Sequence, residues 1–479
     1  MQGILSAAAY VPYRRLDRTT VAEVFGSGGG RGSRAVAGYD EDTTSMGVEA
    51  ARLVLRGAPG IEPRTLWFST TEPAYLDKTN ATTVHAALRL DSDVVAADFA
   101  GAIRSGVAAL GTALHGDAPT LVVTADLRDG LPTSADESAG GDAAAAVLVG
   151  SDRDGSLLAT LVGEGHATEE FIDRWRDPGD RRSKVWEERF GETKYVPLGE
   201  QAWNAALKAA ELTADQVDRL IVTGSHARAV RSLTPRLGVN KSHLVDDRSA
   251  TVGYAGAAMP ALLLTSALEA SAPGETIALV SLADGADVLI FRTTDAVAHW
   301  TPPRRVDAQV EAGEPLPYGK FLAWRGMVTL EPPRRPEPSR ISASVTGRTE
   351  HWKYGFVGSK DRSSGALHLP PQRVSRVGDA VDQMDPAPMA DVDGTIAAFT
   401  IDRIAYSPSP PIVFAIVDFD GGGRLPIELT DVDADQLAVG DRVEMTFRRL
   451  FSADGIRNYF WKARPLRGGA SPRPEERTP

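Results

Sequence analysis

The chain has 479 residues, of which 42% are hydrophobic and 24% charged, a composition typical of soluble globular proteins with two or three domains. Its formal net charge of −12 argues against a general nucleic-acid binder, because such proteins usually carry a basic face. The sequence contains no cysteine, which excludes disulfides, thiolate zinc sites and a cysteine nucleophile.

No apolar run reaches the roughly 18 to 20 residues that a membrane-spanning helix requires. The segment MQGILSAAAYVPYRRL at 1–16 lacks the basic stretch and the long apolar stretch of a secretory signal. We therefore expect a cytoplasmic protein that has neither a membrane partner nor a nucleic-acid partner.

Residues 1 to about 295 alternate between short apolar runs and helical patterns. This alternation predicts an α/β layered fold with mainly buried strands. The expected strands are Thr65–Thr70, Val94–Phe99, Thr120–Ala125, Ala143–Gly150, Arg219–Thr223, Thr276–Ser281 and Asp287–Arg292. The expected helices are Thr44–Leu55, Asn80–Leu90, Gly106–Leu114 and Gly256–Ala270.

Two segments of this region are similar to each other, GDAAAAVLVG at 141–150 and ADGADVLIFR at 283–292. Each is a Gly-Asp-Ala string that runs into an apolar strand. They indicate a duplicated unit with an N-terminal half at 1–155 and a C-terminal half at 156–295.

The composition then changes twice. Residues 296–350 are rich in Pro and Arg and predict an extended connector that lies along a surface, with Trp324 packed on it. Five segments between 394 and 465 alternate with period two and are separated by Gly, Pro and Asp turns, which predicts a small all-β barrel within 381–466. The tail at 467–479 is expected to be disordered.

Several motifs of the first 295 residues resemble the hydroxymethylglutaryl-CoA (HMG-CoA) synthase branch of the thiolase superfamily. They include FSTTEPAYLDKTNATTVHAALRL (68–90), VVAADFAGAIRSGVAAL (94–110), IVTGSHARAVRSLTPRLG (221–238) and TVGYAGAAMPALLL (251–264). The resemblance implies a duplicated αβαβα layered domain that forms a homodimer. It also implies that a coenzyme A or carrier-protein thioester is the substrate and that no cofactor is bound.

Residues 351–466 resemble the zinc-ribbon and OB-fold domain that accompanies thiolase-like enzymes acting on acyl-CoA. The ribbon would span 351–380 and the OB-fold 381–466. At the four cysteine positions of the ribbon stand Asp361, Ser364, Ser375 and Gly378. Zinc binding in the manner of that family is therefore not possible, and we expect no metal site.

In the synthase family a glutamate, a cysteine and a histidine carry the chemistry. The motif match places the glutamate at Glu72 and the histidine at His226, and it places Ile103 where the cysteine would stand. An isoleucine forms no acyl-enzyme. Ile103 either packs in the turn or shapes an apolar acyl pocket together with Arg104, whereas Ser105 lies two residues farther along and has no evident base.

The three candidate catalytic residues each have a structural alternative. Glu72 could be a solvated turn residue or a pocket carboxylate whose pKa burial would raise. His226 could be a structural histidine at the end of a strand. Tyr254 stands where the family has an asparagine loop, and it would serve as a phenolic donor or, with a lowered pKa, as a base.

Four basic residues near the second half, Arg228, Arg231, Lys241 and Arg248, could bind CoA phosphates or face solvent. The glycine-rich stretch GSGGGRGS at 26–33 lacks the preceding strand of a dinucleotide fingerprint. It predicts a flexible loop over the CoA entrance.

The sequence favours an enzyme that makes or breaks a carbon–carbon bond in an acyl thioester without an acyl-enzyme, by aldol, retro-aldol or condensation chemistry of transferase or lyase type. Acyl transfer through a ternary complex is a weaker alternative. The other alternative is a catalytically degenerate acyl-CoA-binding or scaffold subunit, because the cysteine, the loop asparagine and the zinc ligands are lost together.

Overall fold

The computed structural model describes residues 1–466, and the tail predicted to be disordered at 467–479 lies outside the described residues. The chain divides into two compact units, Met1–Thr329 and Leu330–Pro479. Among the described residues no helix has both the length and the hydropathy needed to cross a membrane.

The first unit is built on a nine-stranded sheet in the order β11-β12-β13-β8-β1-β7-β6-β4-β5. Its strands are β1 (Gln2–Tyr10), β4 (Thr65–Thr70), β5 (Val95–Ala100), β6 (Thr120–Asp126), β7 (Ala143–Ser151), β8 (Ala159–Ala167), β11 (Arg219–Gly224), β12 (Thr276–Leu282) and β13 (Ala286–Thr293). The seven strands expected from the apolar runs are all present, with ends that differ by at most one residue.

The pairing pattern confirms an internal duplication. In the first half β4 and β6 are parallel, and β7 joins β6 and β1 in antiparallel fashion. In the second half β11 and β12 are parallel, and β13 joins β12 and β8 in antiparallel fashion. The similar segments at 141–150 and 283–292 therefore form β7 and β13, which occupy equivalent places.

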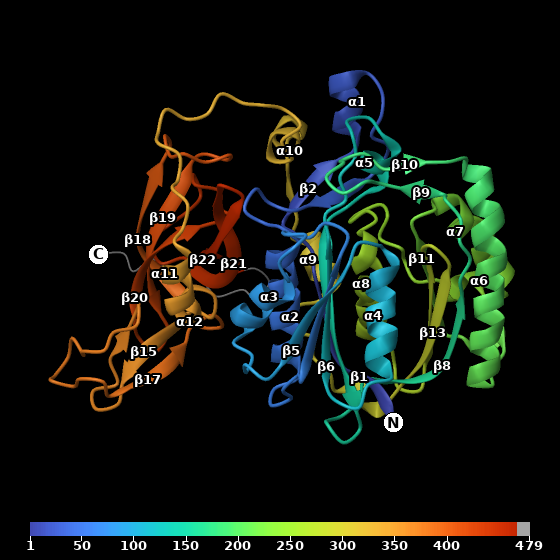
Figure 1. The fold of residues 1–479 in the computed structure, drawn as a ribbon, viewed down its shortest axis with the longest axis horizontal. Helices are drawn as coiled ribbons and strands as arrows, with labels where there is room; N and C mark the ends of the chain where they lie inside the picture. Colours follow the sequence, from blue (N-terminus) through green and yellow to red (C-terminus); the bar gives the residue numbers. More distant parts are fainter. Residues whose placement is uncertain (467–479) are drawn as a thin grey trace, which may run out of the picture. The chain divides into compact units, whose positions relative to one another are not determined.

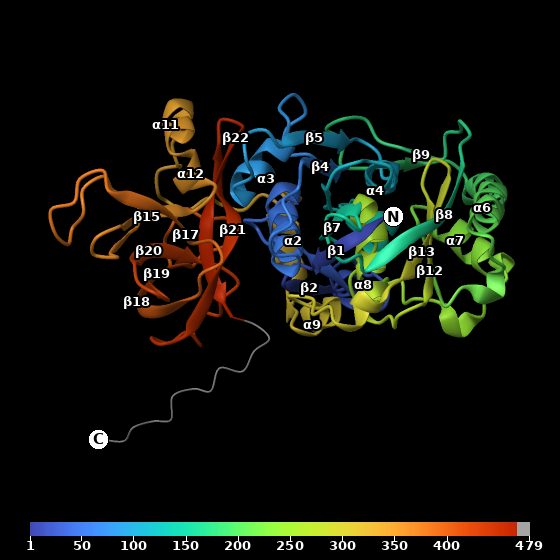
Figure 2. The same ribbon diagram turned by 90° about the horizontal axis from the view of Figure 1, so that it is seen from below.

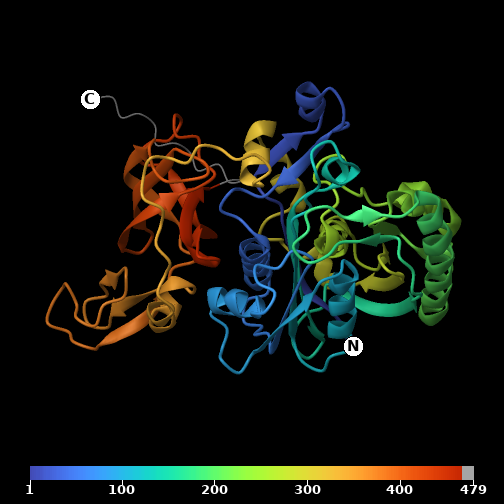
Figure 3. The same cartoon turned by 45° about the horizontal axis from the view of Figure 1, so that its top comes forward.

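The helices sandwich the strands in five alternating layers, as Figure 1 shows from α2 on one side to α6 on the other. Helix α2 (Thr43–Gly57) covers β1, β6 and β7, and α6 (Glu188–Ala210) covers β8 and β13. Helices α4 (Arg104–Leu114) and α8 (Met259–Glu269) contact strands of both halves and form the middle layer. Figures 2 and 3 show the same order of layers from two other directions.

The middle layer accounts for two features of the sequence. Helix α8 is apolar on all sides because both of its faces are covered by strands, and ten of its eleven residues are buried. Gly106 lets α4 approach the chain just before α8, since a Cβ there would lie 2.3 Å from the carbonyl oxygen of Ala257. The expected helices are thus confirmed, with Gly256–Ala270 split into a short 3₁₀ turn and α8.

The remaining elements of the first unit are shorter. They are β2 (Arg14–Asp17), α1 (Thr19–Phe25), β3 (Ser33–Val36), α3 (Ala81–Leu88), α5 (Ala135–Ala139), β9 (Arg174–Trp175), β10 (Lys184–Val185), α7 (Ala227–Leu233), α9 (Val306–Glu311), β14 (Glu314–Pro315) and α10 (Tyr318–Trp324).

Part of the expected extended connector is folded into the first unit. Residues 306–324 contain α9, β14 and α10, and β14 pairs with β2. Leu316, Tyr318 and Phe321 are buried in a small core with residues of β2 and β3. The expectation of an extended connector was based on the high Pro and Arg content of the stretch. These three apolar side chains fold the segment onto the first unit instead, because burying them against a surface is favourable.

The second unit contains α11 (Ala343–Arg348), α12 (Glu350–Lys353), a three-stranded ribbon and a closed five-stranded barrel. The ribbon strands are β15 (Val357–Asp361), β16 (Leu367–His368) and β17 (Met384–Pro388). The barrel strands are β18 (Gly394–Asp402), β19 (Ile412–Phe419), β20 (Arg424–Leu429), β21 (Arg442–Ala453) and β22 (Ile456–Pro465), which confirms the five predicted β segments.

The ribbon is held by hydrogen bonds at three of the four positions where its relatives would carry cysteine. The carboxylate of Asp361 accepts hydrogen bonds from the Ser364 hydroxyl at 2.6 Å and from the Ser363 hydroxyl at 2.7 Å. These bonds hold the pKa of Asp361 well below its usual range. The Ser375 hydroxyl donates to the carbonyl of Val377 at 2.9 Å. A carboxylate that accepts from hydroxyls therefore fastens the turn after β15, at one end of the ribbon.

We expect Asp361→Asn to loosen the ribbon in the intact chain, because the amide is a weaker acceptor than the carboxylate. Amide hydrogen exchange over β15–β17 should accelerate, and a metal chelator should change neither the exchange nor the melting temperature. Since the folded pKa is depressed, this protection should be full above the unfolded pKa of about 3.9 and fall below it. The control is Asp385→Asn at an exposed ion pair with Arg362, which should leave exchange unchanged; equal effects would contradict the assignment.

Candidate functional site

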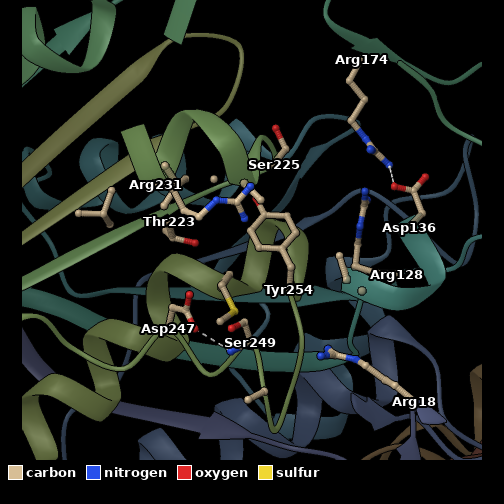
Figure 4. Close-up of a pocket in the computed structure, with 18 of the residues that line it drawn as sticks. Arg18, Arg128, Asp136, Arg174, Thr223, Ser225, Arg231, Asp247, Ser249 and Tyr254 are labelled. Atoms are coloured by element: carbon tan, nitrogen blue, oxygen red, sulfur yellow. Dashed lines mark hydrogen bonds and ion pairs between the residues drawn. The ribbon is translucent and has the colours of Figure 1, made fainter. Parts of the chain in front are cut away.

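A cavity of about 500 Å³ lies in the first unit where the end of β11 faces the loop that carries Tyr254. Figure 4 shows Tyr254 at its centre, with arginines approaching from several sides. The polar residues that line it are Arg18, Arg31, Arg128, Asp129, Asp136, Arg174, Thr223, Ser225, Arg231, Asp247, Ser249 and Tyr254. The apolar part of the wall comes from Val222, Val230, Met259 and neighbouring alanines.

Both backbone polar groups of Tyr254 form hydrogen bonds. Its N–H donates to the carbonyl of Ala139 at 2.8 Å, and its carbonyl accepts from the N–H of Gly141 at 3.1 Å. Gly253 has a φ of 87°, and a Cβ there would lie 2.3 Å from the carbonyl oxygen of Gly140, so this turn requires glycine. These contacts hold the backbone of Tyr254 in the loop from which its side chain enters the cavity wall.

The Tyr254 hydroxyl has no hydrogen-bond partner among the described residues and lies in the wall of the cavity. Burial raises the pKa of Tyr254, while the nearby Arg128 guanidinium opposes that rise. Of the two roles that the sequence left open, the direction of the shift favours the phenolic donor over the base, because the hydroxyl stays protonated near neutral pH.

His226 follows β11 and begins α7. Its Nδ1 accepts a hydrogen bond from the N–H of Ala229 at 3.0 Å, which caps the helix and places the proton of a neutral imidazole on Nε2. Its side chain is only 7% exposed, and Nε2 has no partner. His226 is not among the residues that line the cavity, although its neighbour Ser225 is.

Asp173 lies beside His226, and the sequence reasoning missed it. It is 3% exposed, one carboxylate oxygen has no partner, and burial raises the pKa of Asp173 while His226 opposes that rise. A Cβ on Gly191 of α6 would lie 2.4 Å from Asp173 Oδ1 and 2.7 Å from His226 Nε2. Two buried titratable groups therefore meet beneath a glycine of α6, and Tyr195 packs against the imidazole with ring centroids 5.8 Å apart.

Glu72 lies at the end of β4 and is half exposed. Its carboxylate forms an ion pair with Arg176 at 3.0 Å, and its carbonyl accepts from the Thr43 hydroxyl. It is not among the residues that line the cavity. Glu72 is therefore an exposed, ion-paired carboxylate in this structure and not a buried pocket carboxylate.

A buried carboxylate, Asp126, connects the turn before Glu72 with the loop after Tyr254. Asp126 Oδ1 accepts from the N–H of Thr71 at 2.7 Å, and Oδ2 accepts from the N–H of Ala257 at 2.8 Å. Arg128 extends this connection, because it donates to the Thr71 hydroxyl at 3.0 Å and also lines the cavity.

The turn at Ile103 lies between β5 and α4. Ile103 is partly exposed and does not line the cavity. The Arg104 guanidinium donates to both oxygens of Asp287, at 2.8 and 3.0 Å, and to the carbonyl of Asp284. These bonds direct Arg104 toward β13 and fasten the turn to the second half.

Only one of the four predicted phosphate-binding residues lines the cavity, and that is Arg231. Arg228 pairs with Glu192 at 2.5 Å, and Arg248 pairs with Asp307 at 2.7 Å. Lys241 is exposed in a 3₁₀ turn. The other four arginines of the cavity wall, Arg18, Arg31, Arg128 and Arg174, are far apart in the sequence, and no local motif could have grouped them.

The described part of the chain contains no group of three or more His, Asp or Glu residues placed to hold a metal ion.

Known proteins match the first and the second unit of the chain separately. The HMG-CoA synthase of Thermococcus gammatolerans is 28% identical over 296 residues, which cover 59% of this chain and 83% of that protein. The family described as ChsH2, C-terminal OB-fold domain, matches residues 387–448. The chain is similar to HMG-CoA synthases over its first unit and to the ChsH2 OB-fold family in its second.

The fold of this HMG-CoA synthase-like chain agrees with that of solved relatives. An HMG-CoA synthase complexed with CoA superposes with a TM-score of 0.58 at 16% identity, covering 71% of this chain and 94% of that one. MvaS in complex with 3-hydroxy-3-methylglutaryl coenzyme A superposes with a TM-score of 0.57 at 19% identity, covering 81% and 99%. The thiolase-like fold with a following OB-fold, which the sequence predicted, is thus confirmed.

The close packing over His226 and Asp173 can be tested with Gly191→Ala. The added methyl group would overlap both side chains, so we expect a loss of about 1–3 kcal/mol in the free energy of unfolding. That loss would exceed the gain of about 1 kcal/mol that alanine brings inside a helix.

Gly111→Ala in α4 is the matched control for chemical denaturation, because no atom lies within 4 Å of the new Cβ. It should leave the chain as stable or more stable. If both variants gain stability, the close approach of Gly191 to His226 and Asp173 is wrong.

Proposed function

We propose that the chain binds an acyl thioester of coenzyme A or a carrier protein in the Tyr254 cavity and catalyses aldol or retro-aldol chemistry without an acyl-enzyme. The observation that carries the proposal is the free, protonated hydroxyl of Tyr254 in an arginine-rich cavity, in a chain with isoleucine at the nucleophile turn. The relatives of similar fold include proteins bound to CoA and to HMG-CoA, which supports this substrate class.

The reaction needs no group that the chain lacks. In the retro-aldol direction a base removes the proton of the β-hydroxyl, the bond between the α and β carbons breaks, and its electron pair moves into the thioester as an enolate. The enolate then takes a proton at the α carbon, so the products are a carbonyl compound and a shorter acyl thioester. A cysteine takes no part in these steps.

The chemistry of each side chain at the site suggests its role in this reaction. Tyr254 would donate to the oxygen that gains negative charge, and Arg128 beside it would stabilise the same charge. Glu72 is the proposed base, and the His226–Asp173 pair would take up or return a proton through Nε2. The connection from Thr71 through Asp126 to Ala257 would hold the Glu72 and Tyr254 loops at a constant separation.

Three observations favour a second candidate, a scaffold or acyl-CoA-binding subunit without catalysis. Ile103 offers no nucleophile, Arg104 is committed to Asp287, and Glu72 and His226 do not line the cavity. A binding subunit would keep the arginines of the cavity and need none of the acid–base groups.

A turnover assay distinguishes the enzyme from the binding subunit. The intact chain is incubated with β-hydroxyacyl-CoA substrates, or with pairs of an acyl-CoA and a carbonyl compound, and the products are identified by mass. We expect Tyr254→Phe to reduce kcat roughly 10²–10³-fold, because it removes one donor to the developing oxyanion. Affinity for CoA should change little.

Tyr406→Phe in the second unit is the control and should leave the rate unchanged. Absence of turnover across the whole panel, together with retained CoA binding by the unaltered chain, would refute catalysis and establish the binding subunit.

We also propose that the first unit forms a homodimer through β5. This strand lies at the end of the sheet with β4 as its partner on one side only, and Val95 is 60% exposed. An open edge strand with an exposed apolar side chain is a template for pairing with a second copy.

If two copies pair through β5, Val95→Lys places a charge at the paired edge and should shift the chain from dimer to monomer. Light scattering measures the molar mass. Val24→Lys changes a side chain of the same 60% exposure in α1 and should leave the dimer intact. A monomeric unaltered chain, or a Val95→Lys variant that remains dimeric, would rule out pairing through β5.

A further inference from the structure

Arg18 is a buried cation without a counter-charge. Its side chain lines the cavity and points into it in Figure 4, yet the residue is only 7% exposed. Within residues 1–466, the one hydrogen bond of its guanidinium runs from Nη1 to the carbonyl of Arg31 at 3.3 Å, and Nε and Nη2 have no partner. Among the described residues no carboxylate lies within ion-pair distance of it.

Other buried arginines of the first unit are paired differently. Arg34 forms an ion pair with Asp142 at 3.3 Å, with both side chains fully buried, and Arg325 pairs with Asp129 and Asp142. Arg15 has no carboxylate, but it donates to the carbonyls of Pro12, Arg14 and Gln309. Burying an unpaired guanidinium is costly, so Arg18 is the exception that needs an explanation.

The surroundings of Arg18 add positive charge. Burial and the neighbouring Arg34 lower the pKa of Arg18 to about 10, so it still carries its charge at neutral pH. Arg31 lies in the same wall, exposed and without an ion-pair partner among the described residues.

The acidic side chains of the wall offer Arg18 little compensation. Asp136 is paired with Arg174 and Asp129 with Arg325. Asp247 accepts from the N–H of Ser249, and it lies on the other side of Tyr254 from Arg18 in the view of Figure 4.

We propose that Arg18, together with Arg31, binds an oxyanion of the thioester substrate at this end of the cavity, either a carboxylate on the acyl chain or a phosphate of coenzyme A. This subsite rests on the proposed function, and it narrows the substrate to thioesters that bring a negative charge to Arg18. A guanidinium matches both a carboxylate and a phosphate, since each accepts two parallel hydrogen bonds.

The test compares the unaltered chain with Arg18→Met, which keeps the length of the side chain and removes its charge. Calorimetry would measure the affinity for acetyl-CoA, acetyl-dephospho-CoA, acetyl-pantetheine and succinyl-pantetheine. We expect at least a tenfold loss for the probe whose anion reaches Arg18 and no change for acetyl-pantetheine.

A loss confined to succinyl-pantetheine would identify an acyl carboxylate, and a loss confined to the CoA probes would identify a phosphate. The control is Arg14→Met in the neighbouring strand β2, where the guanidinium lies over the ring of Tyr13 at 5.0 Å and does not line the cavity. If Arg18→Met changes no probe more than Arg14→Met does, the subsite is refuted.

Thermal unfolding gives a second readout that does not depend on thioester binding. Without any anion, Arg18→Met should melt at the same temperature as the unaltered chain or higher, because it removes an unpaired buried charge. Millimolar inorganic phosphate or succinate should raise the melting temperature of the unaltered chain only.

The two proposals fail in different ways. If no thioester probe binds but phosphate still stabilises the chain through Arg18, the proposed function fails and the anion site stands. If Arg18→Met lowers the melting temperature and phosphate acts equally on both chains, Arg18 is structural and the subsite is wrong.

Discussion

The candidate site depends on one buried carboxylate. Asp126 ends β6 and accepts backbone hydrogen bonds from Thr71 and Ala257, which belong to loops almost 190 positions apart in the chain. Burial raises the pKa of Asp126, while these bonds and Arg128 lower it. Neither loop could move independently without leaving a buried carboxylate unsatisfied, a large penalty in the protein interior. The relation between Glu72 and Tyr254 is therefore set by packing at the centre of the unit.

Around this centre the first unit has a thiolase-like framework, in a chain without cysteine. The turn that would present a thiolate presents Ile103, and Arg104 next to it is fastened to Asp287. The cavity wall instead carries a tyrosine hydroxyl and several arginines. In the ribbon of the second unit, Asp361 and serine hydroxyls occupy positions where relatives would bind a metal through cysteine. In both the cavity and the ribbon, the polar contacts are made by side chains other than cysteine.

The sequence predicted the elements of the fold well because their signals are local. The apolar run TLWFST gave β4 with the predicted bounds, and five period-two segments gave the barrel strands. The prediction of an extended connector was less accurate, because it was based on local composition alone. The stretch at 296–350 is rich in Pro and Arg, yet Leu316, Tyr318 and Phe321 in it are buried against β2 and β3. An apolar cluster of three or four residues is too short to show a period.

By itself the sequence determined the layered α/β fold, the OB-fold and the absence of any thiol chemistry, and it indicated Tyr254 as a candidate site residue. Only the tertiary structure decided which arginines reach the cavity, because Arg18, Arg128 and Arg174 come from separate segments of the chain that meet only after the sheet has formed. It also paired His226 with Asp173 beneath Gly191. Burial, which sets the charge state of Tyr254 and the cost of an unpaired Arg18, is a property of the packed chain and has no signature in a linear motif.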